Sequence, residues 1–200
     1  MSGSPTPPLP ELILASTSPY RRALMDRLGL PFRWLPPRFD ESSVRDQDAD
    51  PRWVAEARAA GKAESLAGSH FGATIIASDQ VAVLENRVLG KPGTKARAVD
   101  QLLELSGRPH TLITSLVVRQ GNKRFGHLDI SRLTMRALRR EELKRYVERD
   151  SPLDCAGSYK LEAGGIVLFE RIETEDSSAI TGLPLIALTT ILRELGYAIP

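Results

Sequence analysis

The sequence predicts an α/β protein with a mixed, twisted sheet and flanking helices. Short β-branched runs alternate with helical patterns along the whole chain, and hairpin signals lie between some of the strands, so both parallel and antiparallel pairs are expected. The chain has 200 residues, of which 42% are hydrophobic and 26% charged, which is enough for one domain with a sizeable core. The sequence contains no internal repeat, which argues against a solenoid or a repeat array.

The strands are predicted from short apolar runs that polar or turn residues bound. The clearest is 74–77, which is β-branched and ends at Ser78-Asp79-Gln80. Glu85-Asn86-Arg87 is the expected turn of one hairpin, and 120–123 is the turn of another. In chain order, the predicted strands cover residues 12–15, 32–35, 74–77, 81–84, 88–89, 111–119, 124–135 and 165–172.

The helices are predicted from their start and stop signals around amphipathic patterns. Ser18 can cap the first helix and Pro19 fits its first turn, while Pro184 and Gly196 mark the two ends of the last helix. The predicted helices cover residues 19–28, 51–66, 95–105, 141–148 and 183–195. Residues 1–10 hold four prolines and little to bury, so we expect a flexible Pro/Ser-rich tail followed by a single domain over 11–200.

Composition and charge exclude several classes of protein. Lys and Arg number 27 against 25 Asp and Glu, and a net charge of +2 is too small for a nonspecific nucleic-acid surface or a polybasic membrane anchor. Cys155 is the single cysteine, which excludes an internal disulfide and a zinc finger. Neither a membrane span nor a signal peptide is recognisable. We therefore expect a cytoplasmic protein that binds neither nucleic acid nor a membrane.

The motif Ser16-x-Ser18-Pro19-x-Arg21-Arg22 lies between the first strand and the first helix. Free N–H groups at a helix start, two hydroxyls and two guanidinium groups together favour phosphate binding. No Walker motif occurs, which disfavours an ATPase of that kind. The alternative is an ordinary Ser-Pro helix cap followed by two solvated arginines.

Carboxylates form the second candidate feature. Asp79 directly follows a buried strand, so we expect it at the end of the sheet, where α/β ligand sites form, and it is the leading catalytic candidate. The alternative is a turn residue that bonds its own backbone. Glu41, with Asp40 as the less favoured neighbour, could join Asp79 in holding magnesium and activating water. Three lysines near element ends could neutralise phosphate oxygens: Lys62, Lys91 and Lys160.

Other catalytic arrangements are disfavoured. His70, His110 and His127 show no metal-ligand spacing, and no Gly-x-Ser-x-Gly elbow accompanies them, so zinc hydrolysis and a serine triad are poor fits. Cys155 lies in a tight small-residue stretch that is more typical of a buried thiol than of a nucleophile.

These residues together make the chain resemble the Maf-like nucleotide pyrophosphatases from Leu12 to about Gly196. The motifs that carry the resemblance are Leu14-Ala15-Ser16-Thr17-Ser18-Pro19-Tyr20-Arg21-Arg22, Phe39-Asp40-Glu41, Ser78-Asp79-Gln80-Val81, Gly90-Lys91-Pro92, Ala156-Gly157-Ser158-Tyr159-Lys160-Leu161-Glu162 and Gly182-Leu183-Pro184-Leu185. One departure is Ser178, where the family commonly has asparagine, and a weaker loop contact is expected there.

The resemblance implies an enzyme that hydrolyses noncanonical or surplus nucleoside triphosphates to the monophosphate and pyrophosphate with Mg²⁺ or Mn²⁺. It also implies two lobes related to inosine triphosphate pyrophosphatases, with the nucleotide in the cleft between them, and it is compatible with a homodimer. The implied roles are Asp79 as general base and metal ligand, Glu41 as metal partner, and the triphosphate holders Ser16, Arg21, Lys62 and Lys91. Ser18, Arg22, Asp40 and Lys160 are further candidates.

Three positions resemble the branch of the family that prefers 7-methylguanosine triphosphate: Tyr20, Gln80 and Glu162. Methylation makes guanine cationic, so an aromatic ring can stack on it and a carboxylate can offset its charge. One alternative is a pyrophosphatase of the same family that hydrolyses dTTP or UTP instead. Another is a non-enzymatic regulator of septum formation or cell division, as the family's history suggests.

Overall fold

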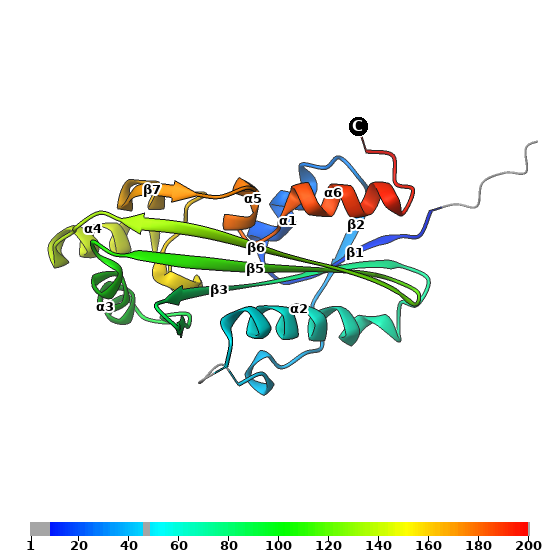
Figure 1. The fold of residues 1–200 in the computed structure, drawn as a ribbon, viewed down its shortest axis with the longest axis horizontal. Helices are drawn as coiled ribbons and strands as arrows, with labels where there is room; N and C mark the ends of the chain where they lie inside the picture. The colour runs from blue at the N-terminus through cyan, green and yellow to red at the C-terminus, as the bar shows by residue number, and fades with distance from the viewer. Residues whose placement is uncertain (1–8, 46–48, 200) are drawn as a thin grey trace, which may run out of the picture.

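The computed structural model describes residues 9–45 and 49–199, and it confirms the predicted mixed α/β fold. Figure 1 shows one twisted sheet whose longest strands extend along the long axis of the molecule. The described residues form seven strands in the order β2-β1-β3-β5-β6-β7, with β4 paired to β3. Their bounds are β1 Leu12–Ala15, β2 Phe32–Leu35, β3 Thr74–Leu84, β4 Arg87–Leu89, β5 Pro109–Gln120, β6 Lys123–Met135 and β7 Phe169–Glu173. Most of the predicted tail, residues 1–8, lies outside the described residues.

Strand directions are mixed, as the sequence predicts. Strand β1 pairs in parallel with β2 and β3, whereas β3, β5, β6 and β7 pair antiparallel. The helices are α1 Pro19–Asp26, α2 Pro51–Ala67, α3 Lys95–Leu105, α4 Arg140–Asp150, α5 Ser177–Ile180 and α6 Leu185–Glu194. In the described part of the chain, no helix combines the length and apolar character needed to cross a membrane.

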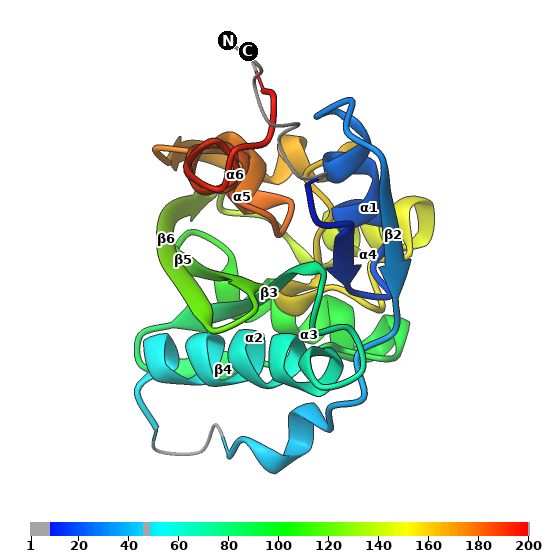
Figure 2. The same cartoon turned by 90° about the vertical axis from the view of Figure 1, so that its right-hand side faces the viewer.

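Helices cover both faces of the sheet at one end of the molecule. Alternate residues of β1 face opposite sides, so Ile13 packs with Ala63 of α2 while Leu14 packs with Leu188 of α6. In Figure 2, α2 and α6 accordingly lie on opposite sides of the strands.

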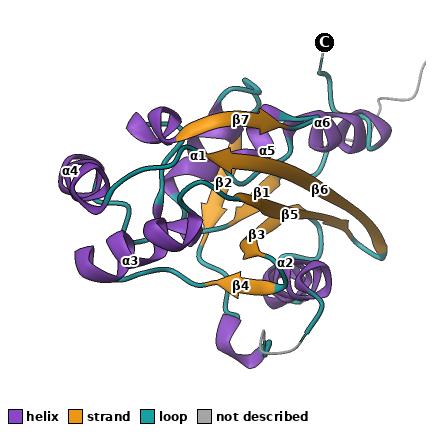
Figure 3. Ribbon diagram, turned by 60° about the vertical axis from the view of Figure 1, so that its left-hand side comes forward, coloured by secondary structure: helices purple, strands orange, loops and turns teal. Residues whose placement is uncertain are grey.

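A second core lies at the other end, where α3 and α4 pack together (Figure 3). Leu102 of α3 and Leu143 of α4 are both fully buried in it, against Leu133 of β6. The long strands thus connect two lobes, each with its own core.

Strand β3 is longer than predicted, and this changes the position of Asp79. We expected a strand over 74–77 that ends at Ser78-Asp79-Gln80, but β3 continues unbroken because β5 pairs with it from Thr74 to Val83. Asp79 pairs with Ser115 of β5 and therefore lies in the middle of a central strand, not at the end of the sheet.

The prediction of a strand over 165–172 is wrong in its first half. Gly164–Leu168 forms a 3₁₀-helix, and β7 begins only at Phe169. Gly165 donates its N–H to the Lys160 carbonyl at 2.8 Å, and a Cβ at Gly165 would overlap the Lys160 backbone. Short helix α5 was not predicted. Helix α6 starts at Leu185 instead of 183, because Leu183 precedes a proline and Pro184 is extended (φ −69°, ψ 97°) and forms the N-cap instead of the first turn.

Candidate active site

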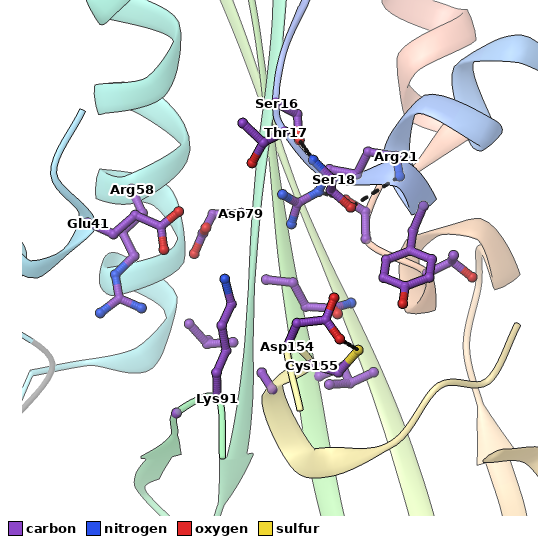
Figure 4. Close-up of a pocket in the computed structure, with 18 of the residues that line it drawn as sticks. Ser16, Thr17, Ser18, Arg21, Glu41, Arg58, Asp79, Lys91, Asp154 and Cys155 are labelled. Atoms are coloured by element: carbon purple, nitrogen blue, oxygen red, sulfur yellow. Dashed lines mark hydrogen bonds between the residues drawn. The ribbon is translucent and has the colours of Figure 1, made fainter. Parts of the chain in front are cut away.

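A pocket of about 910 Å³ lies where the two lobes meet, a size typical of a small-molecule site. Its walls come from the β1–α1 loop, α2, β3, the segment after β4, and the segment before the 3₁₀-turn Ala156–Ser158. Figure 4 shows part of its lining. The pocket therefore gathers segments that are far apart in the sequence.

The β1–α1 loop turns its polar groups into the pocket. Ser16 Oγ accepts the Ser18 N–H at 3.1 Å, and Ser18 Oγ caps α1 by accepting the Arg21 N–H at 3.4 Å. Ser16, Ser18 and Arg21 all line the pocket, as the motif predicts. The start of α1 is thus held beside two hydroxyls and a guanidinium group.

Arg21 is fixed by a loop from the other end of the chain. Its Nε donates to the Gly182 carbonyl at 2.8 Å, and Ser78 Oγ donates to the same oxygen at 2.8 Å. Burial lowers the pKa of Arg21, while the nearby carboxylates of Asp79 and Glu41 oppose that shift. Arginine stays protonated under all ordinary conditions, so it brings a permanent positive charge to the pocket.

Ser178 holds the Gly182 loop despite replacing the expected asparagine. Its Oγ accepts the Leu185 N–H at 2.8 Å and donates to Asp176 Oδ1. Asp176 Oδ2 in turn accepts the Ile186 N–H at 2.8 Å, so Asp176 and Ser178 together satisfy the start of α6. The serine therefore takes part directly in positioning the loop that holds Arg21.

Lys62 joins the two candidate carboxylates. Its Nζ lies 2.5 Å from Asp79 Oδ1 and 2.8 Å from Glu41 Oε1. Lys62 and Asp79 are only 4% and 5% exposed, whereas Glu41 is partly exposed. Burial raises the pKa of Glu41, but the positive charges of Lys62, Lys91 and Arg58 outweigh it and lower that pKa. Glu41 is therefore ionised at neutral pH.

Asp79 presents one uncommitted oxygen. Its Oδ2 is buried and accepts no hydrogen bond from the described residues. Burying an acceptor atom without a hydrogen-bond partner costs free energy, so a ligand, an ion or a water molecule is expected to contact this oxygen. Figure 4 shows Lys91 extending its amino group toward Asp79 from below.

The donor set fits a divalent cation that arrives with a phosphate ligand. Mg²⁺ is commonly held by one or two carboxylates together with waters and substrate phosphates, and Asp79 and Glu41 supply two carboxylates in contact with one ammonium group. Among the described residues there is no group of three or more His, Cys, Asp or Glu that could hold a metal ion. The ion would therefore need ligands from the substrate.

The opposite end of the pocket carries carboxylates and an aromatic ring. Tyr20, Asp154, Cys155 and Glu162 line it. Burial raises the pKa of Glu162 from its ordinary value. Burial, followed by the charges of Asp154 and Glu162, raises the pKa of Cys155 to about 12, so its thiol is protonated and a poor nucleophile.

Gln80 follows Asp79 on β3 and also lines the pocket. Its Nε2 lies 2.9 Å from the Ala179 carbonyl, 3.0 Å from the Ile180 carbonyl and 2.8 Å from Thr114 Oγ1. Two of these partners can only accept, so the amide nitrogen must face them. Its carbonyl oxygen remains as an acceptor for a ligand.

The structure leaves three candidates outside the pocket lining. Arg22 is exposed and lies 4.9 Å over the ring of Trp34, and Asp40 accepts the Ser42 N–H at 2.9 Å as the cap of a 3₁₀-turn. Lys160 Nζ donates to the Ser151 carbonyl at 3.2 Å and lies 3.6 Å from Asp154 Oδ1. Asp40 and Lys160 thus contact the lining residues Ser42 and Asp154, whereas Trp34, the partner of Arg22, does not line the pocket.

Two arginines in the lining were missed from the sequence, Arg45 and Arg58. Arg58 is four residues before Lys62 on α2, so the two share a helix face, and this spacing was a signal that could have found it. Arg45 lies in a polar loop and carries no such signal.

The pocket is polarised along its length. One end holds two carboxylates, Glu41 and Asp79, and five cations, namely Arg21, Arg45, Arg58, Lys62 and Lys91. At the other end, Asp154 and Glu162 line the wall with Tyr20. Lys160 lies outside the lining, with its Nζ 3.6 Å from Asp154 Oδ1 and 5.9 Å from the centre of the Tyr20 ring, so Glu162 is the acidic group at this end that makes no ion pair with another described residue. A ligand that is anionic at one end and cationic at the other would match both ends.

The fold and this pocket agree with one family of proteins. The family model described as "Maf-like protein" matches residues 11–195, and the chain belongs to that family. It is 46% identical over 190 residues to a 7-methyl-GTP pyrophosphatase of Ralstonia nicotianae, covering 94% of this chain and 97% of the relative. Relatives with the same name in Bdellovibrio bacteriovorus and Pseudomonas aeruginosa are 43% and 44% identical, covering 93% and 96% of this chain and 97% and 100% of their own lengths.

Proposed function

We propose that this chain hydrolyses 7-methyl-GTP to 7-methyl-GMP and pyrophosphate. The observation that carries the proposal is the opposite charge at the two ends of one pocket. The names of the relatives from Ralstonia nicotianae, Bdellovibrio bacteriovorus and Pseudomonas aeruginosa support the same substrate.

The cationic end is suited to a triphosphate. Bound triphosphate carries close to four negative charges, so its oxygens need several cations and N–H donors. Arg21, Lys62 and Lys91 supply the cations, while Ser16 and the capped start of α1 supply hydroxyl and N–H donors.

The other end is suited to a cationic purine. The ring of Tyr20 can stack on methylated guanine, whose positive charge strengthens the contact. Glu162 can offset that charge and accept the hydrogens on guanine N1 and N2. A uracil or thymine ring has neither the charge nor this pair of donors, so Glu162 would be left poorly satisfied.

Asp79 is the catalytic base in this proposal. Its free Oδ2 accepts a proton from a water molecule as that water's oxygen attacks the α-phosphorus. The bond between the α-phosphorus and the oxygen that bridges to the β-phosphorus breaks, and its electron pair leaves with pyrophosphate. Lys62 holds the other oxygen of Asp79 and so fixes the direction of the free one.

Glu41 and Asp79 would hold Mg²⁺ or Mn²⁺ together with the phosphate oxygens. When bound, such an ion neutralises phosphate charge and orients the triphosphate. Chelation with EDTA should therefore abolish turnover, and added Mg²⁺ or Mn²⁺ should restore it.

The direct test is pyrophosphate release from 7-methyl-GTP, GTP, dTTP, UTP, CTP and ATP by the wild type and by Asp79→Asn. The expected result is a preference for 7-methyl-GTP that the variant loses while keeping its fold by circular dichroism. Preference for dTTP or UTP would overturn the assignment of the base. Release from no nucleotide would overturn the enzymatic function and favour the regulatory alternative.

The expected homodimer and the expected cytoplasmic location stay predictions. Light scattering of the purified protein tests the first, and fractionation of cells tests the second.

A further inference from the structure

We propose that Arg58 binds the pyrophosphate that leaves in the reaction, an inference that rests on the proposed function. Arg58 lines the pocket from α2, one helical turn before Lys62. Lys62 is fixed against Asp79, so the neighbouring turn brings Arg58 to the same wall of the pocket as the proposed catalytic base.

The guanidinium group lies on the phosphate side of the pocket. Figure 4 shows Arg58 next to Glu41, with Lys91 between it and the pair Asp154 and Cys155. Since Asp154 belongs to the end suited to the base, a nucleotide whose α-phosphate is at Asp79 would extend its β- and γ-phosphates toward Arg58. The position of Arg58 therefore matches the leaving group and not the nucleoside.

The electrostatics support the same position. Arg58, Lys62 and Lys91 all lower the pKa of Glu41, so three cations act on one carboxylate. Asp79, the other carboxylate at this end, already contacts Lys62. A further anion between Arg58 and Lys91 would be attracted by both of them.

The chemistry of the leaving group gives Arg58 a role that a single lysine does not fill. Negative charge develops on the bridging oxygen and the β-phosphate as the bond to the α-phosphorus breaks. A guanidinium group can donate two parallel hydrogen bonds to phosphate oxygens, whereas an ammonium group acts as a point charge. Arg58 would thus hold pyrophosphate in one orientation while Lys91 supplies charge.

Calorimetric titration with inorganic pyrophosphate tests this inference without requiring turnover. The proteins compared are the wild type, Arg58→Gln, Arg58→Lys and Arg52→Gln, all in the presence of Mg²⁺. Arg52 is on the same helix, is exposed and does not line the pocket, so Arg52→Gln removes one charge as a matched control. Thermal melting checks that each variant is folded.

Arg58→Gln should weaken pyrophosphate binding by about tenfold or more, the usual cost of losing hydrogen bonds to a charged group. The pyrophosphate affinity of Arg58→Lys should lie between those of Arg58→Gln and the wild type. Arg52→Gln should bind pyrophosphate as tightly as the wild type does. Binding of 7-methyl-GMP should change less than twofold in Arg58→Gln.

Two results would overturn the role of Arg58: unchanged pyrophosphate affinity in Arg58→Gln, or an equal loss of affinity for pyrophosphate and 7-methyl-GMP. A failure of the proposed function would give a different result from these two. In that case the wild-type protein would release no pyrophosphate from any nucleotide, independently of the affinities measured for the Arg58 variants.

Discussion

Lys62 Nζ lies 2.5 Å from Asp79 Oδ1, and both side chains are almost completely buried. The pair joins α2 to the middle of β3 and leaves the second oxygen of Asp79 without a partner among the described residues. Removal of Lys62 leaves Asp79 and Glu41 without the cation they share, whereas removal of the Asp79 charge leaves Lys62 paired with Glu41.

Lys62→Met should therefore lower both stability and turnover. Breaking a buried ion pair costs about 3–5 kcal/mol, and the loss of Lys62 also leaves the carboxylates of Asp79 and Glu41 without their shared cation. Urea unfolding and pyrophosphate release measure the two effects. Lys95→Met is the control, because Lys95 is exposed on α3. Wild-type stability together with wild-type turnover in Lys62→Met would contradict this account.

Gly61→Ala should disturb Glu41 without touching it. A Cβ at Gly61 of α2 would overlap the ring of Phe39. Phe39 is two residues before Glu41 in the chain. The ring must move and shift the segment that carries Glu41, so turnover should fall by about tenfold or more. The Mg²⁺ concentration for half-maximal turnover should rise.

Gly68→Ala is the matched control for this variant. Gly68 is at the end of the same helix, has a φ of −67°, and has open space where a Cβ would be. Its kinetics should equal those of the wild type. The double variant Gly61→Ala with Phe39→Leu should recover part of the lost turnover, because the smaller side chain leaves room for the new methyl group. Wild-type kinetics in Gly61→Ala would refute the role of this contact.

Glu162→Gln should reduce the preference for the cationic base. The amide cannot offset the charge of 7-methylguanine, so the ratio of kcat/KM for 7-methyl-GTP to that for GTP should fall by about tenfold. Steady-state kinetics with both nucleotides give this ratio. Glu170→Gln, at an exposed position of β7, should leave this ratio unchanged. If Glu162→Gln kept the wild-type ratio, Glu162 would not be a specificity residue.

His110 should make the protein less stable in mild acid. Burial lowers the pKa of His110 to about 4, and its Nε2 lies 2.8 Å from the hydroxyl of Tyr159, which lines the pocket. Between about pH 6.5 and pH 4, His110 is protonated in the unfolded chain but stays neutral in the folded protein. Stability is therefore lost as the pH falls from about 6.5 toward 4, by roughly 3 kcal/mol in total.

Urea unfolding at pH 7.5 and pH 5 tests this dependence. His110→Gln should show a smaller difference between the two pH values than the wild type does. His127→Gln, which replaces an exposed histidine, should behave like the wild type. Equal pH dependence in the wild type and His110→Gln would show that another group causes it.

Much of the fold follows from local sequence signals. Ser18 caps α1 as predicted, and short apolar runs locate β1, β2 and the first part of β3. Asp79 was misplaced because three polar residues after an apolar run look like the end of a strand. Only the long-range pairing with β5 carries β3 through them, and no local pattern reveals that pairing.

The candidate site was predictable where a motif joins several polar groups in one short segment, as at Ser16 and Arg21. Single charged residues were harder to place. Lys160 was expected near phosphate, but its amino group donates to the Ser151 carbonyl. Arg58 lines the pocket although it belongs to none of the motifs that carry the family resemblance. Side-chain direction at such positions depends on tertiary packing.

The most direct test of the central claim is hydrolysis of 7-methyl-GTP in water enriched in ¹⁸O, followed by mass spectrometry of both products. Attack on the α-phosphorus by a water that Asp79 deprotonates should place one ¹⁸O atom in 7-methyl-GMP and none in pyrophosphate. Asp79→Asn should form neither product at a measurable rate. Label in pyrophosphate, or release of a single phosphate, would contradict the assignment of the phosphate end and of Asp79.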